Sequence, residues 1–162
     1  MHKIAVLTAA AATMAMLASP VPASEPPSQA AVSPSLSPAA KSAATTVDAF
    51  HAALRTGRTD AAVALLADDA LIFEGGGVEH GKAEYAAEHL NADAEFSKSV
   101  ASLVTRRAGD SNGDWAWVAS EGRTTGTYKG KAIDQATTET VLLRRDGSAW
   151  KIVHIHWSSG RR

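Results

Sequence analysis

Two hydrophobic patterns follow one another along this chain and restrict the folds open to it. Near its start, Val47, Phe50 and Leu54 recur at intervals of three and four, which is the spacing of one helix face. After Phe96 the pattern changes to that of β-strands separated by turn residues. Helices followed by strands predict the α+β class, in which helices pack on one face of an antiparallel sheet.

Caps and turns set the expected bounds of these elements. Thr45 or Thr46 and Thr59 can cap two helices, and Asp146-Gly147 is a strong hairpin signal. We expect helices at about 45–57, 59–69 and 82–90, and strands at 70–74, 99–107, 115–121, 132–145 and 150–158. The predicted fold is a cone of three N-terminal helices packed on a curved antiparallel sheet, with a pocket between the helices and the concave face. Trp115 and Trp117 share a strand face and are expected in the core.

The first 23 residues have the pattern of a secretory signal peptide. Lys3 precedes the uncharged apolar segment 4–18, and Val21 and Ala23 place small residues before a cleavage site at Ser24. This segment is shorter than the roughly 20 residues of a membrane-spanning helix. We therefore predict a periplasmic or secreted protein with no membrane anchor after cleavage. Residues 24–41, rich in Pro, Ser and Ala, are predicted to be a disordered linker, and 42–162 the folded domain.

Composition excludes several classes of function. The 16 Lys and Arg against 17 Asp and Glu leave a net charge of −1, which argues against a nucleic-acid partner. The absence of cysteine excludes disulfides, thiolate metal sites and a cysteine nucleophile. The chain also lacks the motifs of serine hydrolases, phosphate loops, dinucleotide-binding folds and zinc proteases. No cofactor is predicted.

Two segments resemble the nuclear transport factor 2-like superfamily, in its SnoaL-like bacterial branch. They are VDAFHAALRTGRTDAAVALLADDALIFEGG at 47–76 and RRDGSAWKIVHIHWSS at 144–159, within a resemblance that covers about 43–159. The resemblance implies paired helices, a closing hairpin, an internal pocket and dimers across the sheet. It implies no single function, because this fold hosts isomerases, hydrolases, cyclases, dehydratases and proteins without catalytic activity.

The last predicted strand carries two histidines on one face. By analogy with the family, we assign His154 and His156 to the concave side together with Trp150 and Ile152. The other face would then carry Lys151, Val153, Ile155 and Trp157. Two histidines two apart on a strand have Cβ atoms about 6–7 Å apart. That spacing suits two ligands of one metal ion or a base with its orienting partner, but equally one core histidine and one residue at the rim.

Four further residues are candidates for the pocket. Tyr85 and His89 lie four apart on a predicted helix and could direct a phenol and an imidazole into the cavity. Glu74 ends a strand, either at the pocket mouth or in a solvated turn. Glu139 interrupts a strand, and its burial would require a partner because an unpaired buried carboxylate is costly.

Three functions remain open at this point. The preferred one is a pocket that binds a small-molecule ligand, with His154 or His156 as a base and Tyr85 as a hydrogen-bond donor. Its predicted ligand-binding residues are Glu74, Tyr85, His89, Glu139, His154 and His156. The second is a periplasmic copper or zinc site formed by His89, His154 and His156, with Glu74. The third is a non-enzymatic interaction module that forms a homodimer through the outer sheet face.

Overall fold

The computed structural model describes residues 35–161, so the predicted signal peptide and most of the predicted linker lie outside the described residues. The helices are α1 (Lys41–Thr56), α2 (Thr59–Ala64), α3 (Lys82–Glu88) and α4 (Leu90–Ser99). The strands are β1 (Leu66–Glu74), β2 (Gly77–His80), β3 (Val100–Asn112), β4 (Trp115–Tyr128), β5 (Lys131–Asp146) and β6 (Ala149–Arg161). Within 35–161, none of the helices is both long and apolar enough to cross a membrane.

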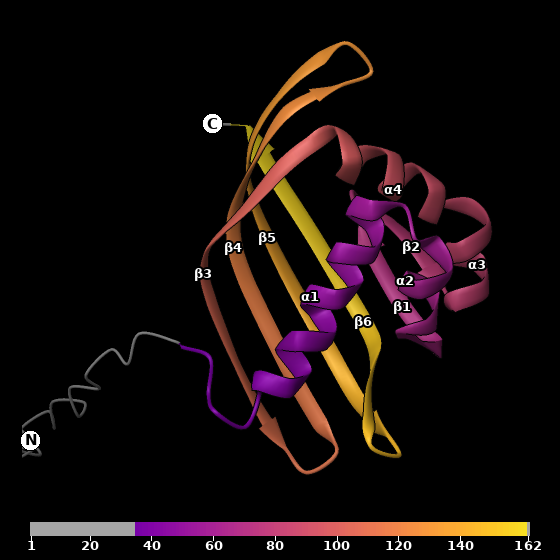
Figure 1. Cartoon of the computed structure of the whole chain (residues 1–162), viewed down its shortest axis with the longest axis vertical. Helices are drawn as coiled ribbons and strands as arrows, with labels where there is room; N and C mark the ends of the chain where they lie inside the picture. Colours follow the sequence, from indigo (N-terminus) through magenta and orange to yellow (C-terminus); the bar gives the residue numbers. More distant parts are fainter. Residues whose placement is uncertain (1–34, 162) are drawn as a thin grey trace, which may run out of the picture. The chain divides into compact units, whose positions relative to one another are not determined.

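The six strands form one sheet in the order β2-β1-β6-β5-β4-β3 (Figure 1). All neighbours are antiparallel except β1 and β6, which are parallel, so the expectation of a fully antiparallel sheet is wrong at this pair. Helix α1 packs on β4 and β6, and α3 packs on β1 and β2. The α+β class is confirmed, and β2 is a strand that the sequence analysis did not predict.

The first helix begins earlier than expected, and the helices are more numerous. Helix α1 starts at Lys41 rather than near Thr45, and its N-cap residue, Ala40, makes no side-chain cap hydrogen bond. The chain breaks its helical path at His89 (φ −117°) and continues as α4, a fourth helix in a segment to which no element was assigned. The expected three helices are therefore four in residues 35–161.

The last part of the predicted linker is ordered against the sheet. Leu36 forms a bridge to Gly109 of β3, and the Ser37 hydroxyl donates a hydrogen bond to Asp110 at 2.7 Å. Gly109 allows this approach, because a Cβ there would lie 2.9 Å from Leu36 Cδ1 and 2.6 Å from the Trp117 carbonyl oxygen. Ala40 is fully buried. The prediction of disorder is thus wrong for residues 35–41. The small residues that suggested a linker allow this segment to pack closely against the sheet.

Strand register places one apolar residue from each of four strands in a row on the inner face. Val118 of β4 pairs with Val141 of β5, which pairs with Ile155 of β6, which pairs with Ile72 of β1. Each of these side chains is at most 1% exposed. Phe50 of α1 belongs to the same core cluster, so this row is the floor on which the first helix packs.

A β-bulge in β6 decides which residues of that strand reach the interior. Leu143 pairs with Ile152 and Leu142 with His154, so Val153 has no partner of its own on β5. An extra residue shifts the alternation of faces by one position. Trp150 and Ile152 point inward before the bulge, and Ile155 and Trp157 do so after it.

Two expectations about faces are wrong, and the first is wrong because of this bulge. His154 and His156 do not lie on the inner face, because the strand alternation that placed them there is interrupted at Val153. Trp115 and Trp117 are 50% and 40% exposed and do not lie in the core. Ala116 and Val118, which alternate with them on β4, are buried and face the helices instead.

This assignment predicts a large loss of stability for one substitution in β6 and almost none for its neighbour. Ile155→Ala should lower the free energy of unfolding by about 2–5 kcal/mol, because it opens a cavity in the apolar row. His156→Ala should change it by no more than about 0.5 kcal/mol, because His156 is exposed. Chemical denaturation of both variants checks this, and a larger loss for His156→Ala would refute the bulge.

Candidate functional site

A cavity of about 340 Å³ lies between α1, α4 and the inner face of the sheet. It begins where the next inward-facing row of the sheet replaces apolar residues with polar ones. That row contains, in pairing order, Arg107, Ser120, Glu139, Trp157 and Glu74, and all of them line the cavity. The apolar core and the polar cavity are therefore formed by adjacent rows of the same sheet face, two residues apart along each strand.

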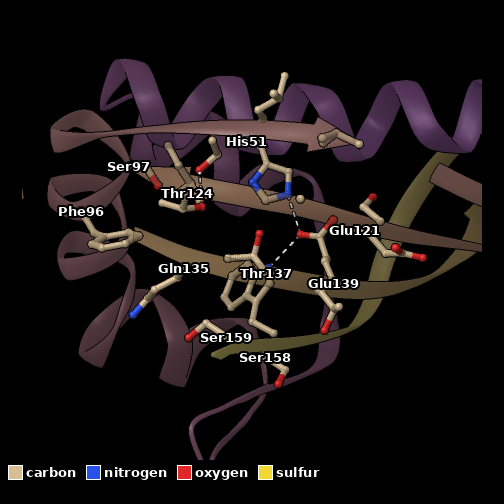
Figure 2. Close-up of a pocket in the computed structure, with 18 of the residues that line it drawn as sticks. His51, Phe96, Ser97, Glu121, Thr124, Gln135, Thr137, Glu139, Ser158 and Ser159 are labelled. Carbon is tan, nitrogen blue, oxygen red and sulfur yellow. Dashed lines mark hydrogen bonds and ion pairs between the residues drawn. The ribbon is translucent and has the colours of Figure 1, made fainter. Parts of the chain in front are cut away.

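Hydroxyl groups recur along the rest of the wall. Ser102 and Thr124 hydrogen-bond to each other at 3.0 Å, and Thr137 and Ser159 follow on β5 and β6. Figure 2 shows Thr124, Thr137 and Ser159 around the central pair of His51 and Glu139. A wall with many hydrogen-bonding groups suits a polar ligand better than a purely apolar one.

The central pair joins α1 to β5. His51 Nε2 lies 2.6 Å from Glu139 Oε2, and the same oxygen accepts a hydrogen bond from Trp157 Nε1 at 2.7 Å (Figure 2). The side chain of Glu139 is only 10% exposed, and that of His51 is 30% exposed. Phe50 stacks on Trp157 with ring centroids 6.3 Å apart. Among residues 35–161, neither Glu139 Oε1 nor His51 Nδ1 has a hydrogen-bond partner, so each retains a free polar atom.

These contacts determine the charge of Glu139. Burial alone would raise the pKa of this carboxyl, but the hydrogen bond and charge of His51, followed by the hydrogen bond from Trp157, outweigh burial. The net effect places the Glu139 pKa below its ordinary value. Glu139 is therefore a carboxylate at neutral pH and can orient the imidazole beside it.

A second titratable cluster lies at the β1 end of the cavity. His89 Nδ1 lies 2.6 Å from Glu79 Oε1, and His89 Nε2 lies 3.7 Å from Glu74 Oε2. The same nitrogen is 3.9 Å from Asp93 Oδ1, while the Tyr85 hydroxyl donates to Asp93 Oδ2 at 2.7 Å. One nitrogen of His89 and one oxygen each of Glu74 and Asp93 lie within 4.8 Å of one another, an arrangement that could hold a metal ion.

Burial and mutual repulsion shift the pKa values in this cluster. Burial and then the charge of Asp93 raise the pKa of Glu74, and burial raises the pKa of Asp93 despite the Tyr85 hydrogen bond. Burial would lower the pKa of His89, but the charges of Asp93 and Glu79 outweigh it and raise that pKa. Burial is also the main cause of the raised pKa of Tyr85. The cluster thus retains protons more strongly than its side chains would in water.

The structure divides the predicted site residues into three groups. Glu74 and Glu139 line the cavity, and Glu139 has the partner that its burial requires. Tyr85 is fully buried and, like His89, contacts the cavity-lining Asp93 rather than the cavity itself.

His154 and His156 are the third group, and they lie away from the cavity. His154 Nδ1 is 3.0 Å from the Leu71 carbonyl oxygen, and both imidazoles pack edge-on against Phe73. The three histidines of the predicted metal set therefore do not converge. The predicted roles of His154 and His156 as pocket bases have no geometric support.

Sequence reasoning missed His51 and Arg107. His51 follows Phe50, so it lies beside the apolar stripe of α1 and faces the cavity edge, but nothing in the local pattern marks its partner 88 residues away. Arg107 donates hydrogen bonds to Ser120 at 3.1 Å and to Asp48 at 2.6 Å. The Ser120 contact depends on strand register and the Asp48 contact on the position of α1 over the sheet, so neither follows from sequence spacing.

Comparisons with known proteins agree with this architecture. The family profile of the SnoaL-like domain matches residues 43–161. A search of curated proteins gives no match. Among solved structures, a candidate ketosteroid isomerase from Shewanella frigidimarina is 38% identical, with a TM-score of 0.70 over 72% of this chain and 94% of that one.

Two more distant structures share the fold alone. A candidate dehydratase of the NTF2-like family from Streptomyces avermitilis is 18% identical, with a TM-score of 0.65 over 76% of this chain and 98% of that one. A protein with a cystatin-like fold from Nostoc punctiforme is 15% identical, with a TM-score of 0.64 over 78% and 95%. The resemblance inferred from the two sequence segments is confirmed: the chain belongs to the SnoaL-like family of the NTF2-like superfamily.

Proposed function

We propose that the cavity binds a small polar organic molecule and that the His51–Glu139 pair moves a proton to or from it. The observation that carries this proposal is the geometry of the pair. One oxygen of the buried Glu139 holds His51 at 2.6 Å, while Glu139 Oε1 and His51 Nδ1 have no hydrogen-bond partner within 35–161. An oriented imidazole beside an ionised carboxylate is a common arrangement for general acid–base catalysis.

Each neighbour of the pair has a role in this chemistry. Glu139 accepts from His51 Nε2, which leaves Nδ1 to take a proton, and the carboxylate then stabilises the imidazolium. Trp157 donates to the same carboxylate oxygen and is itself held by stacking on Phe50, so Glu139 cannot easily rotate away. The hydroxyls of Ser120 and Thr137 line the cavity and could steady negative charge that develops on an oxygen of the ligand.

The Shewanella relative supplies one probe for the reaction. Its description as a candidate ketosteroid isomerase supports proton transfer next to a carbonyl group as the reaction class. The hydroxyl-lined wall in this chain favours a smaller and more polar ketone. We therefore choose two test substrates. A ketosteroid represents the substrate named in the description of the relative, and dihydroxyacetone represents the smaller and more polar ketone.

We predict that the wild-type chain accelerates deuterium uptake from D₂O into the carbon next to the carbonyl of dihydroxyacetone more than into the ketosteroid. His51→Ala and Glu139→Gln should each lower this rate about 10²–10⁴-fold, because the positioned base or its orienting carboxylate is lost. Proton NMR measures the exchange.

His156→Ala is the matched control, because it removes an exposed imidazole outside the cavity. It should retain the wild-type rate. An unaltered rate in His51→Ala, or no acceleration by the wild type with either ketone, would count against proton transfer at this pair.

The direction of the Glu139 pKa shift predicts a pH-dependent stability. A lowered folded-state pKa stabilises the fold fully above the ordinary value of 4.5, and this stabilisation is lost as the pH falls through the lowered pKa. Glu139→Gln should therefore cost about 1.5–3 kcal/mol near neutral pH and less in acid. Urea denaturation between about pH 3 and pH 7, in the presence of a chelator, measures the difference.

Asp93→Asn is the comparison with the opposite sign. Because the folded-state pKa of Asp93 is raised, its ionised form carries a penalty that is present above that pKa and absent below the ordinary value of 3.8. The stability of Asp93→Asn relative to wild type should thus improve as the pH rises. Parallel pH curves for both variants and the wild type would contradict the two assignments.

We also propose that the domain forms a homodimer through its outer sheet face. Trp117, Leu142, His154 and Leu71 follow one another in register across β4, β5, β6 and β1. The three apolar members of this outer row are 38–40% exposed. A row with three large, partly exposed apolar side chains on the face without helices is typical of a surface that a second copy covers. Export through residues 1–23 stays a prediction, since these residues lie outside the described part of the chain.

Leu142→Glu should convert the wild-type dimer to a monomer at micromolar concentration, because it places a charge in the centre of the outer row. Sedimentation velocity distinguishes the two states. Val104→Glu is the control, because Val104 is 48% exposed but lines the cavity, in register with Gly122 and Thr137, rather than the outer face. A wild-type monomer at this concentration would end the dimer proposal.

A further inference from the structure

We infer that Glu74, His89 and Asp93 form a site for one divalent transition-metal ion of the zinc type at the edge of the cavity. The ligand atoms are His89 Nε2, one carboxylate oxygen of Glu74 and Asp93 Oδ1. This set differs from the histidine trio expected from the sequence. It is also separate from the His51–Glu139 pair, so its test does not depend on the proposed proton transfer.

The spacing of the ligand atoms fits an ion after a small contraction. With bonds of about 2.0–2.2 Å, neighbouring ligands of a tetrahedral zinc ion are about 3.3–3.5 Å apart. His89 Nε2 lies 3.7 Å from Glu74 Oε2 and 3.9 Å from Asp93 Oδ1. Both distances are too long for hydrogen bonds and need to shorten by only a few tenths of an ångström around an ion. The oxygens of Glu74 and Asp93 lie within 4.8 Å of each other and would have to move closer together as the ion binds.

Surrounding residues leave the required atoms free. Glu79, which is 9% exposed, bonds to His89 Nδ1, so the proton of a neutral imidazole stays on Nδ1 and Nε2 offers its lone pair. Tyr85 occupies Asp93 Oδ2 and leaves Oδ1 facing His89 Nε2. A carboxylate behind a ligating histidine and a donor behind a ligating carboxylate are the usual outer contacts of protein metal sites.

The charge of the cluster also favours a cation. Glu74, Glu79 and Asp93 place three carboxylates around one imidazole, and within 35–161 their ion pairs are all with His89. A neutral His89 would direct the Nε2 lone pair at two carboxylates, which is repulsive. A second proton on His89 would remove that repulsion, and so would a metal ion, which accepts the Nε2 lone pair and binds both carboxylates.

The donor types restrict the kind of ion. One imidazole nitrogen with two carboxylate oxygens favours Zn²⁺ or Mn²⁺ over Ca²⁺ and Mg²⁺, which prefer oxygen alone. Copper(I) would require soft sulfur ligands, whereas the chain has no cysteine and its three methionines all precede residue 17. Because Glu74 and Asp93 line the cavity, the coordination positions not used by protein would face the bound molecule.

Calorimetric titration of the full chain with ZnCl₂ after chelator treatment tests this site. We expect one ion per chain with micromolar or tighter affinity and a raised melting temperature. His89→Ala and Asp93→Asn should each weaken binding at least about tenfold. Asp93→Asn keeps an oxygen for Tyr85, so it remains a valid test if circular dichroism shows that His89→Ala does not fold.

Glu79→Gln tests the outer contact and should weaken zinc binding about 10–100-fold without removing a ligand. The double variant His154→Ala/His156→Ala is the matched control, and it should bind zinc like the wild type. Millimolar binding by the wild type, unchanged affinity in Asp93→Asn, or loss of binding only in the double control would each overturn the site.

Discussion

The extra residue in β6 at Val153 is the constraint on which the interior depends. Without it, His154 and His156 would face α1, and Ile155 and Trp157 would face outward. With it, Ile155 completes the apolar row under α1, and Trp157 reaches the carboxylate of Glu139. One backbone irregularity thus separates a hydrophobic floor from a polar cavity, because side-chain direction in a strand has a period of two.

Beyond the bulge, the cavity is organised by two buried acids with opposite pKa shifts. Glu139 has an imidazole and an indole N–H on one oxygen, and these contacts lower its pKa against burial. Asp93 lies among other carboxylates, and burial raises its pKa. Neighbouring groups whose environments push their pKa values apart are a frequent property of sites that transfer protons or bind metals. The two ends of one cavity therefore have different chemistry although both are carboxylate-rich.

The outer face of the sheet is the counterpart of the cavity. The same alternation that turns Val118 and Val141 inward turns Trp117 and Leu142 outward. The central strands carry large apolar residues on both faces. One face packs against the helices, and the other is available to another protein surface. His154 belongs to this outer face, which explains a histidine-rich last strand without giving it a role in the cavity.

The sequence alone determined the class of fold, the family and several residues of the site. Helical spacing around Phe50, the turn at Asp146-Gly147 and the two family-like segments predicted helices packed on a sheet. The rule that a buried carboxylate requires a partner singled out Glu139. These features are local, so a short stretch of residues is enough to reveal them.

Only the tertiary structure decided which residues meet. The pairing of His51 with Glu139 spans 88 positions, and the approach of Glu74 to His89 and Asp93 joins a strand end to a helix. The sequence does not show the bulge at Val153, the fourth helix after His89 or the packing of Leu36 on Gly109. Each depends on strand register and close contact between distant segments, and the free energy of that packing overrides local periodicity.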